Sequence, residues 1–154
     1  MTKTVSLSPD VYRGRSVASA SIAVHECGHV VQHDTAYSML KLRTALVPVV
    51  KVAAVAQQWG FLAAMLFLGS FPQLLLIVII AMVITTFFSL VTLPVEFDAS
   101  RRALAWLENT GTMIGMEHDF AKDSLKWAAM TYFVAALASV AMLVYFILSY
   151  LGRR

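Results

Sequence analysis

The sequence has little charge and a single cysteine. Of its 154 residues, 14% are charged and 59% are hydrophobic, and the mean hydropathy is +0.73. A chain of this length cannot bury so much apolar surface in one small core, so lipid is the expected solvent for much of it. Cys27 has no second cysteine to pair with, which excludes an internal disulfide. No cleavable signal peptide is expected, because residues 1–10 are polar.

The longest stretch without charge lies between Lys51 and Glu96 and contains 44 residues. As helix, at about 1.5 Å per residue, it would extend about 66 Å, enough to cross a hydrocarbon core of about 30 Å twice. The break at residues 69–73 divides it into two expected spans, 52–69 and 74–95. Gln57 and Gln58 weaken the first of these. A further uncharged run of 25 residues predicts a third span over 127–151.

These runs predict a mainly α fold: a single integral membrane helical bundle, residues 1–154, with about three transmembrane helices. A helix is expected over residues 16–34, and a polar helical loop over 96–126, in which a helix begins at Glu96 and glycines form a turn at 111 and 115. Residues 4–7 alternate between polar and apolar, which leaves room for a small N-terminal β element.

The net charge of +3 does not indicate a nucleic-acid partner, because the basic residues flank the apolar runs and form no dense patch. The expected partner is the lipid bilayer, and the expected location is the cell membrane. A two-span hairpin returns the chain to the side it left, which places Glu96 on the same face as residues 25–29. Ten Lys and Arg residues lie on that side and two beyond the third span, so the positive-inside rule predicts that this face is cytoplasmic.

The strongest motif is HExxH at residues 25–29. His25 and His29 are four residues apart, so on a helix they share a face and their imidazoles can converge on one cation. Glu26 is offset by about 100° on the helix and lies beside the metal, where a carboxylate can take a proton from metal-bound water. The pattern predicts a zinc hydrolase with Zn²⁺ as its cofactor. The alternative is a pair of surface histidines that merely share a face.

A catalytic zinc usually has three protein ligands and one open position. His33 is excluded as the third, because it lies about 12 Å along the helix from His25 and zinc–nitrogen bonds are about 2 Å. Glu96 is the best candidate, since a carboxylate at the membrane border is costly without a partner. It could also be an ordinary interfacial acid. The other candidates on this side are His118, Asp10, Asp34, Asp98, Glu108, Glu117, Asp119 and Asp123.

Two segments carry a family resemblance: HECGHVVQH, and LPVEFDASRRAL after the apolar hairpin. Together they resemble the membrane neutral zinc metallopeptidases of the YugP type over nearly the whole chain. The resemblance implies that His25, His29 and Glu96 bind zinc and that Glu26 is the catalytic base. Members of that family typically begin with another membrane span, so this sequence is expected to be a short variant or a truncated reading frame.

A looser likeness connects the chain to membrane gluzincins such as the HtpX-type and CAAX-prenyl proteases. In those families the ligand glutamate is followed four residues later by an aspartate. Here that position is Ser100, and the nearest acid is Asp98. Asp98 is therefore the first candidate for a residue that orients a zinc-binding histidine without touching the metal.

The expected function is zinc-dependent hydrolysis of a peptide or membrane-protein substrate. The sequence identifies no oxyanion donor: His118, Arg101 and Arg102 could serve, but charges of this kind at a membrane border are more commonly solvated. A non-catalytic zinc-binding adaptor or assembly factor is the alternative, because the chain is too short for a separate substrate-binding domain. A metal transporter is disfavoured, since the three expected spans contain no Asp, Glu or His. Oligomerisation stays open.

Overall fold

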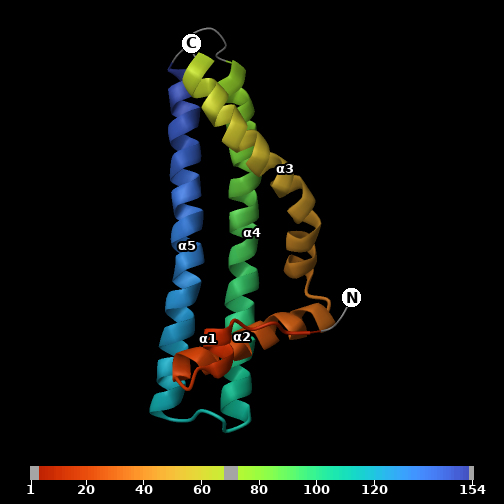
Figure 1. Ribbon diagram of the computed structural model, residues 1–154, viewed down its shortest axis with the longest axis vertical. Helices are drawn as coiled ribbons and strands as arrows, with labels where there is room; N and C mark the ends of the chain where they lie inside the picture. Colours follow the sequence, from red (N-terminus) through yellow and green to blue (C-terminus); the bar gives the residue numbers. More distant parts are fainter. Residues whose placement is uncertain (1–3, 68–72, 153–154) are drawn as a thin grey trace. The chain divides into compact units, whose positions relative to one another are not determined.

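The computed structural model describes residues 4–67 and 73–152, and within them every regular element is an α-helix (Figure 1). The mainly α prediction is confirmed. Residues 4–8 form no strand, so the N-terminal β element is not found there. The expected break at residues 69–73 lies largely outside the described residues. The helices are α1 (Pro9–Arg13), α2 (Val17–Asp34), α3 (Ser38–Phe67), α4 (Gln73–Asn109) and α5 (Met116–Leu151).

The chain divides into two compact units. Unit 1 consists of Met1–Lys41 and Leu93–Tyr132, and unit 2 of Leu42–Thr92 and Phe133–Arg154. The boundaries fall inside α3, α4 and α5, so each of these helices contributes residues to both units.

Helix α2 has the bounds that the sequence predicts. Ser16 is its N-cap, and the side-chain oxygen of Ser16 accepts a hydrogen bond from the backbone N–H of Ser19 at 3.1 Å. This bond satisfies one of the donors that the first turn of a helix leaves free. The helix ends at Asp34, and Ala36 then adopts a φ of +53° in the turn that leads to α3.

Helix α4 differs from the prediction at its middle. A helix was expected to begin at Glu96, after Pro94, but α4 continues through both residues from Gln73 to Asn109. A proline removes one backbone donor and crowds one turn, and the neighbouring hydrogen bonds can hold the helix together. The expected polar loop 96–126 is therefore the end of α4, a short connection and the start of α5. Gly111 and Gly115 in that connection have φ values of +64° and +59°, which confirms the predicted glycine turn.

Two helices in the described part of the chain are long and apolar enough to cross a membrane, namely α4 and α5. The expected spans 74–95 and 127–151 lie within them. The remaining expected span, 52–69, falls mainly in α3, which is not one of the two. Gln57 and Gln58 interrupt the apolar sequence of this helix, and Pro48 lies inside it. The structure therefore supports two candidate spans where the sequence predicts three.

Within unit 2, side chains of the three long helices contact one another. Thr85 of α4 donates a hydrogen bond from its hydroxyl to the side-chain oxygen of Gln57 in α3 at 3.1 Å. Phe61 of α3 packs edge to face against Phe146 of α5, with ring centroids 5.7 Å apart. A cavity of about 560 Å³ lies here, and Ser139 of α5 also lines it.

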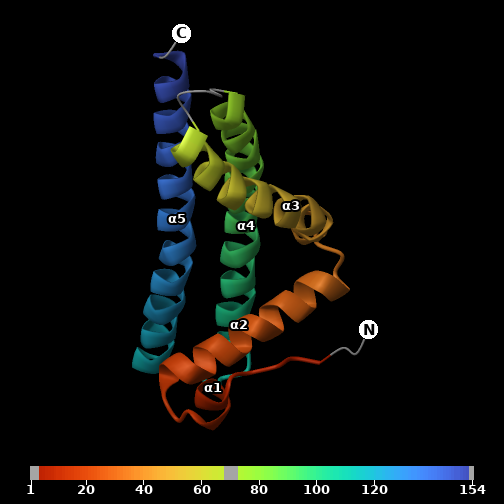
Figure 2. The same cartoon turned by 45° about the horizontal axis from the view of Figure 1, so that its top comes forward.

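Within unit 1, α2 crosses the C-terminal part of α4, and both views show this crossing (Figures 1 and 2). Leu107 and Ala121 are fully buried at the core of the unit, and Val17 and Val24 of α2 pack against them. The two helices approach closely at Gly28, where a Cβ atom would lie 2.6 Å from the backbone oxygen of Ala99. The glycine of the HExxH motif therefore lets the backbone of α2 lie directly on the backbone of α4.

Gly28→Ala should destabilise unit 1. Its methyl group would clash with a backbone atom that cannot rotate away, so the helices must separate. Overpacking of this kind typically costs about 1–3 kcal/mol. We expect a lower unfolding midpoint by circular dichroism in detergent. Cys27→Ala is the matched control, because Cys27 is the exposed neighbour. An unchanged midpoint in Gly28→Ala would show that the close approach is not required.

Candidate metal centre

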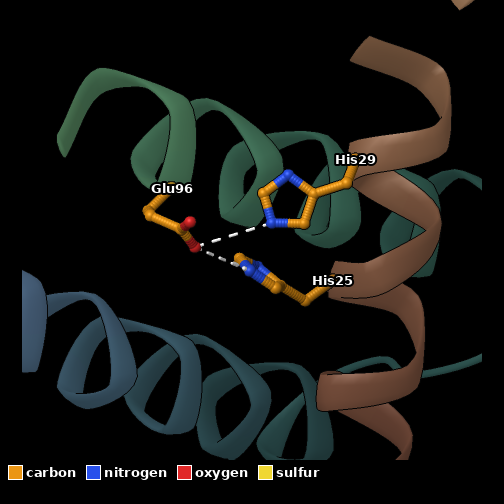
Figure 3. A group of neighbouring side chains, drawn as sticks. All are labelled: His25, His29 and Glu96. Atoms are coloured by element: carbon orange, nitrogen blue, oxygen red, sulfur yellow. Dashed lines mark hydrogen bonds and ion pairs between the residues drawn. The ribbon is translucent and has the colours of Figure 1, made fainter. Parts of the chain in front are cut away.

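His25 and His29 project from α2 toward Glu96 of α4, and all three side chains converge on one point (Figure 3). The Nε2 atom of His25 lies 3.3 Å from Oε2 of Glu96, and the Nε2 atom of His29 lies 3.5 Å from the same oxygen. One donor atom from each residue lies within 4.8 Å of the other two. The structure thus brings together the three residues that the sequence predicts as ligands.

This donor set has the chemistry of a zinc site, and its two nitrogen–oxygen spacings fit one. Catalytic zinc is commonly bound by two histidines and a glutamate. With bonds of about 2.0–2.1 Å, tetrahedral geometry puts neighbouring donor atoms roughly 3.3 Å apart. The two observed nitrogen–oxygen distances of 3.3 and 3.5 Å agree with that spacing.

Burial differs across the cluster. The Glu96 side chain is 3% exposed, whereas those of His25 and His29 are 16% and 21% exposed. A buried carboxylate needs a positive partner, which a metal ion or a protonated histidine can supply. The partial exposure of the histidines leaves one side of the cluster accessible, as a catalytic site requires for water and substrate.

The pKa of His29 is raised above its ordinary value of 6.5. The largest cause is the hydrogen-bonding contact with the Glu96 carboxylate, which stabilises the imidazolium. Partial burial of the ring opposes this effect, and Gln32 and the negative charge of Glu26 add to it. Glu26 is half-buried on α2 directly after His25, and its negative charge is the smallest of these contributions to the raised pKa of His29.

Each histidine has a second polar contact through its other ring nitrogen. Nδ1 of His29 lies 3.0 Å from Oε1 of Gln32, and Nδ1 of His25 lies 3.2 Å from the hydroxyl of Ser100. In both histidines Nε2 therefore faces Glu96, while Nδ1 contacts a polar side chain on the opposite side of the ring. Such contacts orient metal-binding histidines.

Asp98 reaches the cluster only through an intermediate. Its Oδ2 accepts hydrogen bonds from Gln32 at 2.9 Å and from Arg102 at 2.6 Å, and its Oδ1 accepts one from Arg101. The expectation that Asp98 orients a histidine directly is thus replaced by two residues that sequence reasoning missed, Gln32 and Ser100. Helical spacing carries a signal for both, since Gln32 follows His29 by three positions and Ser100 follows Glu96 by four.

The other candidates lie differently. His33 is exposed and is not part of the cluster, in agreement with its exclusion on distance. Arg101 and Arg102 are engaged with Asp98, which does not favour either as an oxyanion donor. Nε2 of His118 is buried without a hydrogen-bond partner among the described residues.

Comparison with known proteins identifies relatives of the chain. Residues 1–151 match the family described as "putative neutral zinc metallopeptidase". A protein of Bacillus subtilis (strain 168) described as "putative membrane protease YugP" is 41% identical over 152 residues, which cover 99% of this chain and 67% of that protein. No solved structure matches.

Because its pKa is raised, His29 should stay protonated in the metal-free protein up to a higher pH than an ordinary histidine. His29 should titrate above 6.5, and Glu96→Gln should move its pKa downward by removing the carboxylate. Because the folded pKa is raised, the contact stabilises the fold fully below pH 6.5, and this contribution is lost as the pH rises through the folded pKa. NMR of ¹⁵N-histidine-labelled protein would measure the shift.

Glu108→Gln is the control for this titration, because Glu108 is an exposed acid on the same helix. It should leave the His29 titration unchanged. A His29 pKa at or below 6.5 in the parent protein would contradict the assigned contact.

Proposed function

Because the chain belongs to the family of putative neutral zinc metallopeptidases, we propose that it is a membrane-embedded zinc endopeptidase. His25, His29 and Glu96 hold the metal, and Glu26 is the catalytic base. The observation that carries the proposal is the buried Glu96 carboxylate, which faces the Nε2 atoms of both histidines at 3.3 and 3.5 Å. Two neutral imidazoles and one carboxylate would supply the three protein ligands that a catalytic zinc commonly has.

Zinc bound here supplies a Lewis acid that lowers the pKa of water and polarises a scissile carbonyl. The protein supplies the proton transfers. Glu26 accepts a proton from the attacking water and delivers it to the nitrogen of the leaving amine, which needs a carboxylate next to the metal and not bound to it. Its position directly after His25 on α2 and its electrostatic effect on His29 support this role.

The membrane assignment rests on α4 and α5, and the orientation rests on charge. With residues 74–95 of α4 in lipid, Glu96 and the polar residues after it leave the apolar region on one side. This proposal requires α3 to carry the chain across the membrane as well, because His25 and His29 precede α3 and meet Glu96, which follows the apolar part of α4. Ten basic residues then lie on the side of the site, against two after the span in α5. The positive-inside rule therefore favours a site that faces the cytoplasm. Its substrate is a peptide or a membrane protein that reaches that face.

Metal analysis tests the ligand set. The purified parent protein should contain one zinc per chain, and His25→Ala, His29→Ala and Glu96→Ala should each lose most of it, because each removes one of three protein ligands. His33→Ala is the control, since His33 lies on the same helix outside the cluster. Zinc content that is unchanged in Glu96→Ala would overturn the assignment of Glu96.

Glu26→Gln tests catalysis separately from metal binding. The variant should keep its zinc and lose about 10²- to 10⁴-fold in cleavage rate, the usual contribution of a general base. Cleavage of quenched fluorescent peptides and of a detergent-solubilised membrane protein would measure it. Glu117→Gln is the control, because Glu117 is an exposed acid in the first turn of α5.

Two outcomes would contradict the proposal. Full activity in Glu26→Gln would remove Glu26 from the mechanism. A parent protein that holds one zinc per chain and cleaves no substrate would favour the non-catalytic adaptor.

A further inference from the structure

Gln32 is fully buried beside His29, and each of its polar side-chain atoms has a partner. Its Nε2 donates one hydrogen bond to the backbone oxygen of Val95 at 2.8 Å and another to Oδ2 of Asp98 at 2.9 Å. Its Oε1 lies 3.0 Å from Nδ1 of His29. A buried amide with this many partners on two helices has little freedom to rearrange.

The partners of Gln32 determine which way its amide points. A backbone carbonyl oxygen and a carboxylate can only accept hydrogen bonds, so the amide nitrogen must face Val95 and Asp98. The reversed amide would place its oxygen against two other acceptors in a buried site and leave all three without a donor. Oε1 of Gln32 therefore faces His29.

Asp98 is itself held in place as an acceptor. Arg102 donates to Oδ2 of Asp98 at 2.6 Å, and Arg101 donates to Oδ1. Guanidinium groups carry no acceptor atom and remain protonated in proteins, so Asp98 stays an ionised acceptor toward Gln32. Arg102 also lies over the ring of Tyr37, with its guanidinium carbon 5.9 Å from the ring centroid. The two arginines thus keep Asp98 an acceptor, and Asp98 in turn requires a donor from Gln32.

We propose that Gln32 is a positioning residue that selects the Nδ1–H tautomer of His29. The amide oxygen can only accept, and it lies 3.0 Å from Nδ1 of His29, closer than the 3.5 Å between Nε2 and Oε2 of Glu96, so the single proton of the neutral ring belongs on Nδ1. In the neutral ring the other nitrogen, Nε2, then has a free lone pair, and this atom faces Glu96. Gln32 thereby prepares Nε2 of His29 to bind a metal.

No comparable contact determines the tautomer of His25. Its Nδ1 lies against the hydroxyl of Ser100, and a hydroxyl can either donate or accept. The two histidines of the motif thus differ in how their protonation is controlled. The amide acts on His29 alone.

The tautomer can be measured without zinc. In metal-free protein labelled with ¹⁵N-histidine, at an alkaline pH where the rings are neutral, His29 should show a protonated Nδ1 and an unprotonated Nε2. Gln32→Met, which keeps an unbranched side chain and removes the amide, should give a mixture of both tautomers. Gln32→Glu retains an acceptor oxygen toward His29, and in its protonated form its second oxygen can donate to Asp98 as the amide nitrogen does, so it should restore the Nδ1–H form. Gln57→Met, which removes a hydrogen-bonded amide from unit 2, should change nothing at His29.

Metal affinity is the second readout, and its interpretation rests on the proposed zinc site. Gln32→Met should bind Zn²⁺ about 10- to 100-fold more weakly than the parent, as is typical when the hydrogen-bond partner of a metal-binding histidine is lost. Gln32→Glu should lie between the parent and Gln32→Met, and Gln57→Met should match the parent.

The two claims can fail separately. An Nε2–H tautomer of His29 in the parent protein would overturn the role of Gln32, whatever metal is bound. Retention of the Nδ1–H tautomer and of full affinity in Gln32→Met would do the same. The Nδ1–H tautomer in a parent that binds no zinc would uphold the role of Gln32 and contradict the proposed function. If Gln32→Met does not fold, the parent spectrum and Gln32→Glu decide.

Discussion

The arrangement of unit 1 depends on one buried carboxylate, that of Glu96. It lies inside a continuous helix, shielded from solvent, with the Nε2 atoms of His25 and His29 as partners. A carboxylate in this position is tolerable only if positive charge is brought to it, because burial disfavours the ionised form. The close packing of α2 on α4 brings the two imidazoles to it. Metal binding and the packing of α2 on α4 therefore meet the same need, which is positive charge beside the buried carboxylate of Glu96.

The contact between Gly28 and Ala99 provides the necessary proximity. Two helices normally lie 8–10 Å apart, but a glycine at the crossing point removes the side chain that would separate the backbones. A histidine one position away can then reach a side chain near Ala99 on the opposite helix. The glycine of HECGH is thus structural, and the residues on either side of it differ in role: Cys27 is exposed, and His29 belongs to the cluster.

Sequence reasoning predicted the parts of the site that follow from local rules. The HExxH helix had the expected bounds because its cap and its end are set by neighbouring residues such as Ser16. Glu96 was predicted as a ligand because a carboxylate at the end of a long apolar run is costly without a partner. The continuity of α4 through Pro94 was not predicted, since the tertiary setting overrode a local helix breaker. The role of Gln32 was not predicted either, because its partners Val95 and Asp98 are more than sixty residues away along the chain.

The polar residues of the site come from two short segments, positions 25–32 of α2 and positions 95–102 of α4. Each segment covers about two helical turns. Among the described residues between the two segments none is a candidate metal ligand, and Tyr37 lies against the guanidinium of Arg102. The candidate metal ligands are therefore grouped in two short stretches of sequence, which the close packing of α2 on α4 brings together. These two segments supply the ligands and their hydrogen-bond partners, while Leu107 and Ala121, outside both segments, supply the core against which α2 packs, so the chemistry and the support of the site are encoded in different parts of the chain.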